Sequence, residues 1–124
     1  MTQHLWSLSA TEVALRIASR VVTARQVTQS VLGRIAETNP KFNALAMVSE
    51  ASALKAAAAA DAAQARGDAL GPLHGVPVTI KVNVDVAGEA TTDAVEAFKD
   101  NVAQTDSPLV KSMRDAGAVR SEER

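Results

Sequence analysis

The chain has 124 residues, enough for one small domain at most. It carries 13 basic and 14 acidic residues, for a net charge of −1, and it contains no cysteine. These totals exclude disulfides and thiolate chemistry. They also argue against a nucleic-acid-binding protein, because the sequence has no basic stripe and no block of like charge.

The sequence gives no sign of a membrane segment. No apolar run is longer than Ala56–Ala60, which is far too short to span a bilayer. The first ten residues lack the charged and apolar regions of a signal peptide. We therefore expect a cytoplasmic chain without a membrane partner.

Two helix starts open the chain. Ser9 and Thr23 are each followed three residues later by Glu or Gln, which is the spacing of a capping box. We expect Asn39-Pro40 to end the second helix, since proline disfavours helical geometry in the residue before it. The short connection between the two helices predicts a packed helical hairpin over residues 5–40.

Further along, helix and strand signals alternate. The apolar segment 42–48 is a candidate short strand, and the Ala-rich residues 49–67 predict a helix that ends at arginine and glycine. An acceptor residue followed by proline predicts a fourth helix over residues 106–117. A further strand is expected to begin at Ala118-Val119, and residues 120–124 read as an atypical tail.

The most informative stretch is GPLHGVPVTIKVNVDVAG, residues 71–88. Branched apolar residues occupy every even position from 76 to 86, and this period-2 alternation predicts a β-strand with one buried face. The opposite row carries Lys81, Asn83 and Asp85. Helices that alternate with strands indicate an α/β layered domain.

The polar residues of this region also have structural interpretations. His74 is read as a turn residue, and with no cysteine and no nearby second histidine the sequence predicts no metal site. The glycines do not form a phosphate loop, so no nucleotide cofactor is expected. Ser107 is interpreted as a helix cap, and structural roles are favoured for Asn83 and Asp85. Taken alone, Lys81 is a solvated strand lysine.

Residues 71–88 closely resemble the lysine-bearing segment of the amidase signature family, whose pattern is GPLxGxPxxIKDNxxxxG. The resemblance continues through Thr91-Thr92 and Asp106-Ser107-Pro108 to Ala116-Gly117-Ala118-Val119. It implies N-terminal helices plus the first strands and helix of an amidase-type α/β/α sandwich, incomplete in this chain.

On this resemblance, Lys81 corresponds to the lysine of a Ser–cis-Ser–Lys triad. The family lysine acts as a neutral base, which passes a proton through a bridging serine to activate the nucleophilic serine. An ordinary lysine has a pKa of about 10.4, so such a base must be buried or placed near a positive charge. The resemblance implies hydrolysis of a small amide by acyl transfer to serine, with no cofactor or metal.

Two departures from the family pattern limit this interpretation. Val82 stands where the family often has aspartate, and the Gly/Ser-rich segment that carries both triad serines has no counterpart here. We therefore expect the chain to be inactive alone. The alternative is a non-catalytic truncated fragment, or an association module that pairs with another chain or a second copy through its exposed strand edge.

Overall fold

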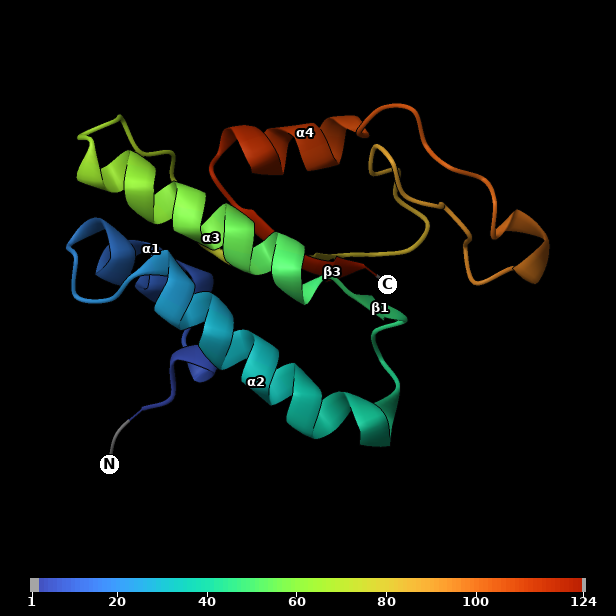
Figure 1. Ribbon diagram of the computed structural model, residues 1–124, viewed down its shortest axis with the longest axis horizontal. Coiled ribbons are helices and arrows are strands. Elements are labelled where there is room, and N and C mark those ends of the chain that lie inside the picture. The colour runs from blue at the N-terminus through green and yellow to red at the C-terminus, as the bar shows by residue number, and fades with distance from the viewer. Residues whose placement is uncertain (1–2, 124) are drawn as a thin grey trace.

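Figure 1 shows the computed structural model, which describes residues 3–123. Three strands form one sheet in the order β1-β3-β2, and β3 pairs antiparallel with β1 and parallel with β2. In chain order, the elements are η1 (Leu5–Ser7), α1 (Ala10–Ala18), α2 (Ala24–Phe42), β1 (Met47–Val48), α3 (Glu50–Ala65), β2 (Pro77–Ile80), η2 (Glu96–Phe98), α4 (Pro108–Asp115) and β3 (Val119–Glu123).

Helices cover both faces of this small sheet. Val119 of β3 packs with Leu32 of α2 and Ala53 of α3. The next residue, Arg120, lies with Val110 of α4 instead, because consecutive strand residues face opposite sides. Figure 1 shows α2 and α3 side by side, with α4 apart from them. The predicted α/β layering is therefore confirmed.

Both predicted capping boxes form. The Ser9 N–H donates to Glu12 Oε2 at 2.9 Å, and the Glu12 N–H donates to Ser9 Oγ at 3.2 Å. Thr23 and Gln26 exchange the same pair of hydrogen bonds, at 2.9 and 3.0 Å. These contacts satisfy backbone donors that have no partner inside a helix, and so they fix the first residues of α1 and α2.

The first capping box makes stability depend on pH. Hydrogen bonds from the backbone and hydroxyl of Ser9 lower the pKa of Glu12. The contribution of a carboxylate with a lowered pKa is present above its unfolded pKa, near 4.3, and is lost as the pH falls through the folded value. We expect the stability advantage of the native chain over Glu12→Gln to shrink below about pH 4.

Urea unfolding of both chains between neutral and acid pH measures this difference. Glutamine is the matched replacement because Gln26 already fills the same position in the second box without a charge. A difference in stability that stays constant with pH would show that ionised Glu12 contributes nothing to the first box.

The prediction that Asn39-Pro40 ends the second helix is wrong, because α2 continues to Phe42. Asn43 then takes the left-handed conformation with φ of 50° and donates its N–H to the Asn39 carbonyl at 2.6 Å. The Asn39 side chain also accepts from the N–H of Leu45 at 2.9 Å and donates to its carbonyl at 3.0 Å. These bonds close the last turn around the proline.

The prediction of one strand along the whole alternating run is also wrong. Within residues 3–123, β3 supplies partners only for Pro77–Ile80. The chain then turns at Lys81, whose carbonyl accepts from the N–H of Val84 at 3.0 Å. The later valines are nevertheless covered, since Val84 and Val86 pack with Val110 under α4. The alternation therefore predicted which residues are covered, but only the first part of it is a strand.

Two smaller boundaries also differ. The candidate strand at 42–48 is reduced to Met47–Val48, because Phe42 still belongs to α2. The supposed tail at 120–124 continues β3 through Glu123, where it pairs with both neighbouring strands, and Arg124 lies outside the described residues.

Candidate functional site

Lys81 lies directly after β2, at the carboxyl end of this parallel strand. Its side chain is exposed, and within residues 3–123 its amino group has no hydrogen-bond or ion-pair partner. In open α/β sheets, functional groups collect at the carboxyl ends of the strands. The fold therefore presents Lys81 on the side of the sheet where such a group is expected.

The structure does not keep Lys81, Asn83 and Asp85 in one strand row, because the turn after Ile80 ends the extended geometry. Asp85 makes its own contacts instead. Its Oδ1 accepts from Thr91 Oγ1 at 2.5 Å, and its carbonyl accepts from the Ser107 N–H at 2.9 Å. These bonds give Asp85 the structural role that was favoured for it.

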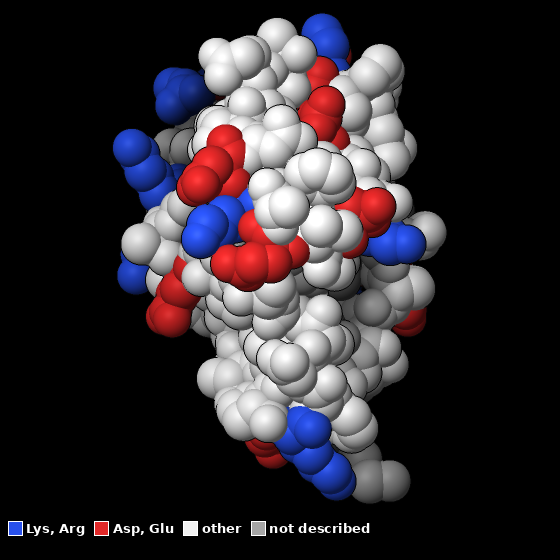
Figure 2. Space-filling model, turned by 90° about the vertical axis from the view of Figure 1, so that its right-hand side faces the viewer, with Lys and Arg blue, Asp and Glu red and all other residues white. Residues whose placement is uncertain are grey.

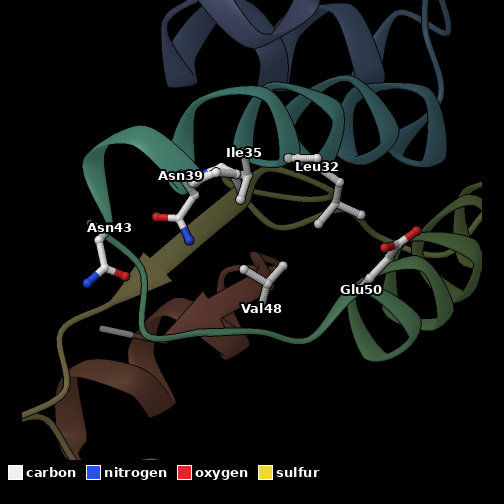
Figure 3. A pocket seen from close by; sticks show the side chains of 8 residues that line it. Leu32, Ile35, Asn39, Asn43, Val48 and Glu50 are labelled. Atoms are coloured by element: carbon white, nitrogen blue, oxygen red, sulfur yellow. The ribbon is translucent and has the colours of Figure 1, made fainter.

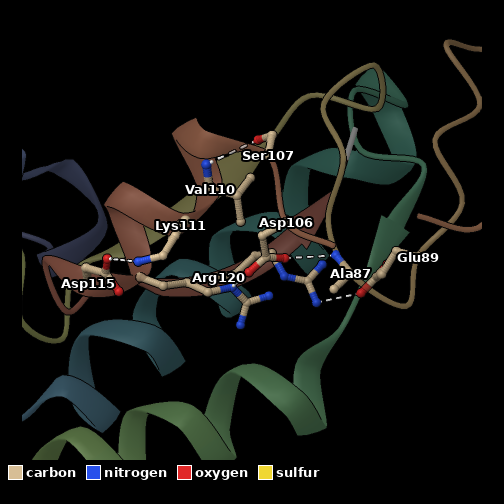
Figure 4. Close-up of polar contacts among 9 residues, drawn as sticks. Ala87, Glu89, Asp106, Ser107, Val110, Lys111, Asp115 and Arg120 are labelled. Atoms are coloured by element: carbon tan, nitrogen blue, oxygen red, sulfur yellow. Dashed lines mark hydrogen bonds and ion pairs between the residues drawn. The ribbon is translucent and has the colours of Figure 1, made fainter. Parts of the chain in front are cut away.

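Further polar contacts tie the segment after Lys81 to the start of α4 (Figure 4). Asp106 Oδ1 accepts from the N–H of Ala87 at 2.8 Å, while its Oδ2 lies 2.9 Å from Nε of Arg114. The N–H of Gly88 donates to the Ala103 carbonyl at 2.9 Å. The long connection between β2 and α4 is thus fastened to itself and to the start of α4.

Sequence reasoning missed an ion pair between Arg120 and Glu89. Arg120 comes from β3 and Glu89 from the connection after Lys81, and their charged groups lie 2.5 Å apart (Figure 4). Both side chains are largely covered, with exposed fractions of 16% and 18%. Nothing in the sequence pairs these two residues, because their contact depends on β3 lying next to β2.

A cavity of about 300 Å³ opens beside the residue that follows Lys81. It lies between β1 and the connection after β2, and its lining residues are Ala46, Met47, Val82, Gly88, Glu89, Ala90 and Thr92. A second cavity of about 400 Å³ lies between α2 and β1, where Leu32, Ile35 and Asn39 face Val48 (Figure 3). Only the first adjoins the predicted site, because the second has no lining residue from the segment around Lys81.

The remaining candidates occupy structural positions. His74 Nε2 lies 2.9 Å from the carbonyl of Ala60, which fastens the glycine-rich turn to α3. Ser107 Oγ accepts the N–H of Val110 at 3.3 Å and caps α4 (Figure 4). Within the described part of the chain, no three histidine, aspartate or glutamate side chains cluster as a metal site would require.

The surface carries charges of both signs. Figure 2 shows acidic and basic side chains next to one another on the face that it presents. None of the helices between residues 3 and 123 is both long and apolar enough to cross a membrane.

These features define the lysine-bearing part of an α/β domain: a glycine-rich turn, a parallel strand, an exposed lysine at its carboxyl end and a long tethered connection to the next helix. The sequence profile of the Amidase family matches residues 26–121. The match covers most of the chain, which therefore belongs to the amidase family.

Individual relatives agree with this assignment. The chain is 42% identical over 115 residues to an indoleacetamide hydrolase of Bradyrhizobium diazoefficiens, which covers 93% of the chain and 22% of the relative. It is 39% identical to one subunit of the glutamyl-tRNA(Gln) amidotransferase of Cutibacterium acnes, covering 94% of the chain and 23% of the relative. The structure of a peptide amidase from Stenotrophomonas maltophilia superposes with a TM-score of 0.83 at 32% identity, covering 94% and 24%.

The chain thus spans about a quarter of the length of the relatives that it matches. Its fold is correspondingly a part of an amidase-signature domain, with the helices and strands that surround Lys81.

Proposed function

We propose that this chain is the lysine-bearing part of an amide hydrolase, in which Lys81 serves as the base for acyl transfer to serine. The observation that carries the proposal is the place of Lys81, directly after a parallel strand and within the segment matched by the amidase family. The two serines and the groups that stabilise the oxyanion belong to protein outside these 124 residues.

In the reaction, the amino group of Lys81 takes a proton through a bridging serine as the nucleophilic serine attacks the amide carbonyl. The C–N bond then breaks, ammonia or an amine leaves with a proton, and water releases the acid from the acyl-serine. A lysine becomes a neutral base when its amino group is buried away from water or when another cation lies beside it. Lys81 is exposed here, so the missing part of the domain has to cover it before it can act.

The isolated chain is therefore expected to release no ammonia from an amide. A fusion provides the positive test, with residues 1–119 joined to the part of the Bradyrhizobium indoleacetamide hydrolase that follows its matched segment. We expect this fusion to release ammonia from indoleacetamide, because the strand and turn that carry Lys81 are restored to a complete domain. A folded fusion without activity would refute the proposal.

The natural substrate class is proposed as a simple amide. The relatives include both a hydrolase and a component of an amidotransferase. The Lys-Val-Asn sequence around Lys81 and the Gly-Glu-Ala-Thr-Thr continuation favour a general amidase. Ammonia release from indoleacetamide without any tRNA distinguishes these two functions.

A non-catalytic association module is the second candidate. The observation that favours it is the edge of β2, which has no neighbouring strand among residues 3–123. Two results together would support the association module: a fusion that folds but does not hydrolyse amides, and a stable complex formed by the unmodified chain. Sedimentation of the chain over a range of concentrations measures that complex.

A further inference from the structure

An open groove runs along α2, away from Lys81. The cavity of about 400 Å³ between α2 and β1 has apolar walls that include Leu32, Ile35 and Val48 (Figure 3). A further cavity, of about 250 Å³ between α2 and α3, adjoins it and shares Leu32 and Glu50 as lining residues. Together the two cavities form one groove, with Asn43 near one end and Glu50 near the other (Figure 3).

Small residues form the rim that α2 gives to this groove. Ala36 is exposed, and a Cβ added at Gly33 would meet no atom within 4 Å. The distance between packed helices depends on the side chains at the contact, so small residues allow a close approach. A second helix can therefore lie directly against this face of α2.

A large aromatic side chain lies on the same face. Phe42 is 67% exposed, although it belongs to the last turn of α2. It follows Ile35 by seven residues, which is about two helical turns, and therefore projects from the same side of the helix. Exposed apolar side chains that gather on one face indicate an interaction surface.

Opposite charges lie beside the phenylalanine and beside the groove. The Nζ atom of Lys41 lies 5.4 Å from the centre of the Phe42 ring. Glu50 borders the groove. Both charged side chains are exposed, and neither has an ion-pair partner among residues 3–123. One face of the chain thus carries a basic aromatic knob, Lys41-Phe42, and an apolar groove with an acidic end.

We propose that this face is a dimer interface, in which the knob of each chain enters the groove of a second copy. A two-fold axis near residue 37 sets the two α2 helices antiparallel. Leu32 and Phe42 are separated by about 15 Å along the helix, at 1.5 Å per residue. Phe42 of one copy then lies over Leu32 of the other, and Lys41 meets Glu50. The same contacts recur with the roles exchanged, as two-fold symmetry requires.

A second copy is the occupant that shape and charge favour. A cavity of about 150 Å³ is enough to hold benzene, so the groove has room for the phenyl ring. The Lys41–Glu50 pairs lie at the rim, where opposite charges select the partner and its orientation more than they add affinity. The contact is confined to one helix face and its groove, and we therefore expect a weak, reversible dimer.

Sedimentation equilibrium of the whole chain between about 10 μM and 1 mM measures the dimer. Phe42→Ala is expected to weaken it by at least about tenfold, because the ring that fills the groove is lost. Ala36→Glu should do the same by bringing two carboxylates together near the axis. Leu15→Ala is the matched control, since Leu15 is 65% exposed but lies on α1, outside the groove. Circular dichroism checks that every variant keeps its helices.

Charge reversal tests the orientation of the two copies. Lys41→Glu and Glu50→Lys are each expected to weaken the dimer about fivefold, because each sets like charges against one another at both contacts. An equimolar mixture of these two variants restores both opposite-charge pairs, and its heterodimer should be within about twofold of the native affinity. The double variant in one chain should regain the native affinity for the same reason.

Three results would overturn the inference. A chain that stays monomeric up to about 1 mM would leave the groove to another part of an amidase domain. A dimer that withstands both Phe42→Ala and Ala36→Glu would have to use another surface, such as the edge of β2. A mixture of the charge variants that associates no better than each variant alone would exclude the antiparallel arrangement. None of these results bears on Lys81, whose role is measured separately through the activity of the fusion.

Discussion

Replacement of Lys81 by methionine is expected to lower kcat/KM of the fusion for indoleacetamide by a factor of about 10² to 10⁴, the range that a positioned acid or base contributes. Methionine keeps an unbranched side chain of similar length but cannot accept a proton. Because the Lys81 side chain is exposed and its amino group makes no polar contact within residues 3–123, the substitution should leave the melting temperature of the isolated chain unchanged.

Lys55→Met is the matched control, since Lys55 is an exposed lysine on α3 and should be replaceable without loss of activity. Lys81→Arg makes the test more specific. Arginine keeps the positive charge but does not lose its proton in proteins, so a base at this position predicts a loss as large as that of methionine. Retained activity in the arginine variant would mean that position 81 acts through its charge, which contradicts the proposed role.

The helical part of the fold was largely predictable because its signals are local. The spacing from Ser9 to Glu12 and from Thr23 to Gln26 placed two helix starts correctly, since a capping box involves residues only three positions apart. The same holds for Ser107 before α4. The end of α2 was misplaced because the helix continues through Pro40 to Phe42, and bonds between Asn39 and Leu45 close its last turn.

The strand region shows where local signals are insufficient. Period-2 alternation records which side chains become covered, but a strand also needs a neighbour along its edge. Val86 is buried by α4 without being in a strand, and Arg120 meets Glu89 only because β3 lies beside β2. The family resemblance is confirmed, whereas the role of Lys81 that the resemblance implied stays a prediction. The alternation alone had favoured a solvated lysine.

Gly75→Ala, in the glycine-rich turn, is expected to produce a large loss of stability. Gly75 has φ of +76°, and a Cβ there would lie 2.7 Å from Cβ of Ala24 and 3.0 Å from Cδ1 of Ile17, which are both fully buried. The left-handed conformation costs alanine about 1 kcal/mol, and overpacking adds about 1–3 kcal/mol. We expect a total near 3 kcal/mol and a melting temperature lower by about 10–20 °C.

Two other glycines isolate the contributions to that loss. Gly67 has φ of +81°, but a Cβ at this position would meet no neighbouring atom within 4 Å, so Gly67→Ala should cost only the conformational term of about 1 kcal/mol. Gly33 lies inside α2 with similar free space, and Gly33→Ala should stabilise the chain by about 1 kcal/mol through helix propensity. Urea unfolding of the three variants measures the series. A Gly75→Ala chain no less stable than Gly67→Ala would show that the turn does not pack against α1 and α2 as tightly as the distances require. That turn leads directly into β2, which Lys81 follows. Such a result would therefore also mean that the turn holds β2 and Lys81 less rigidly.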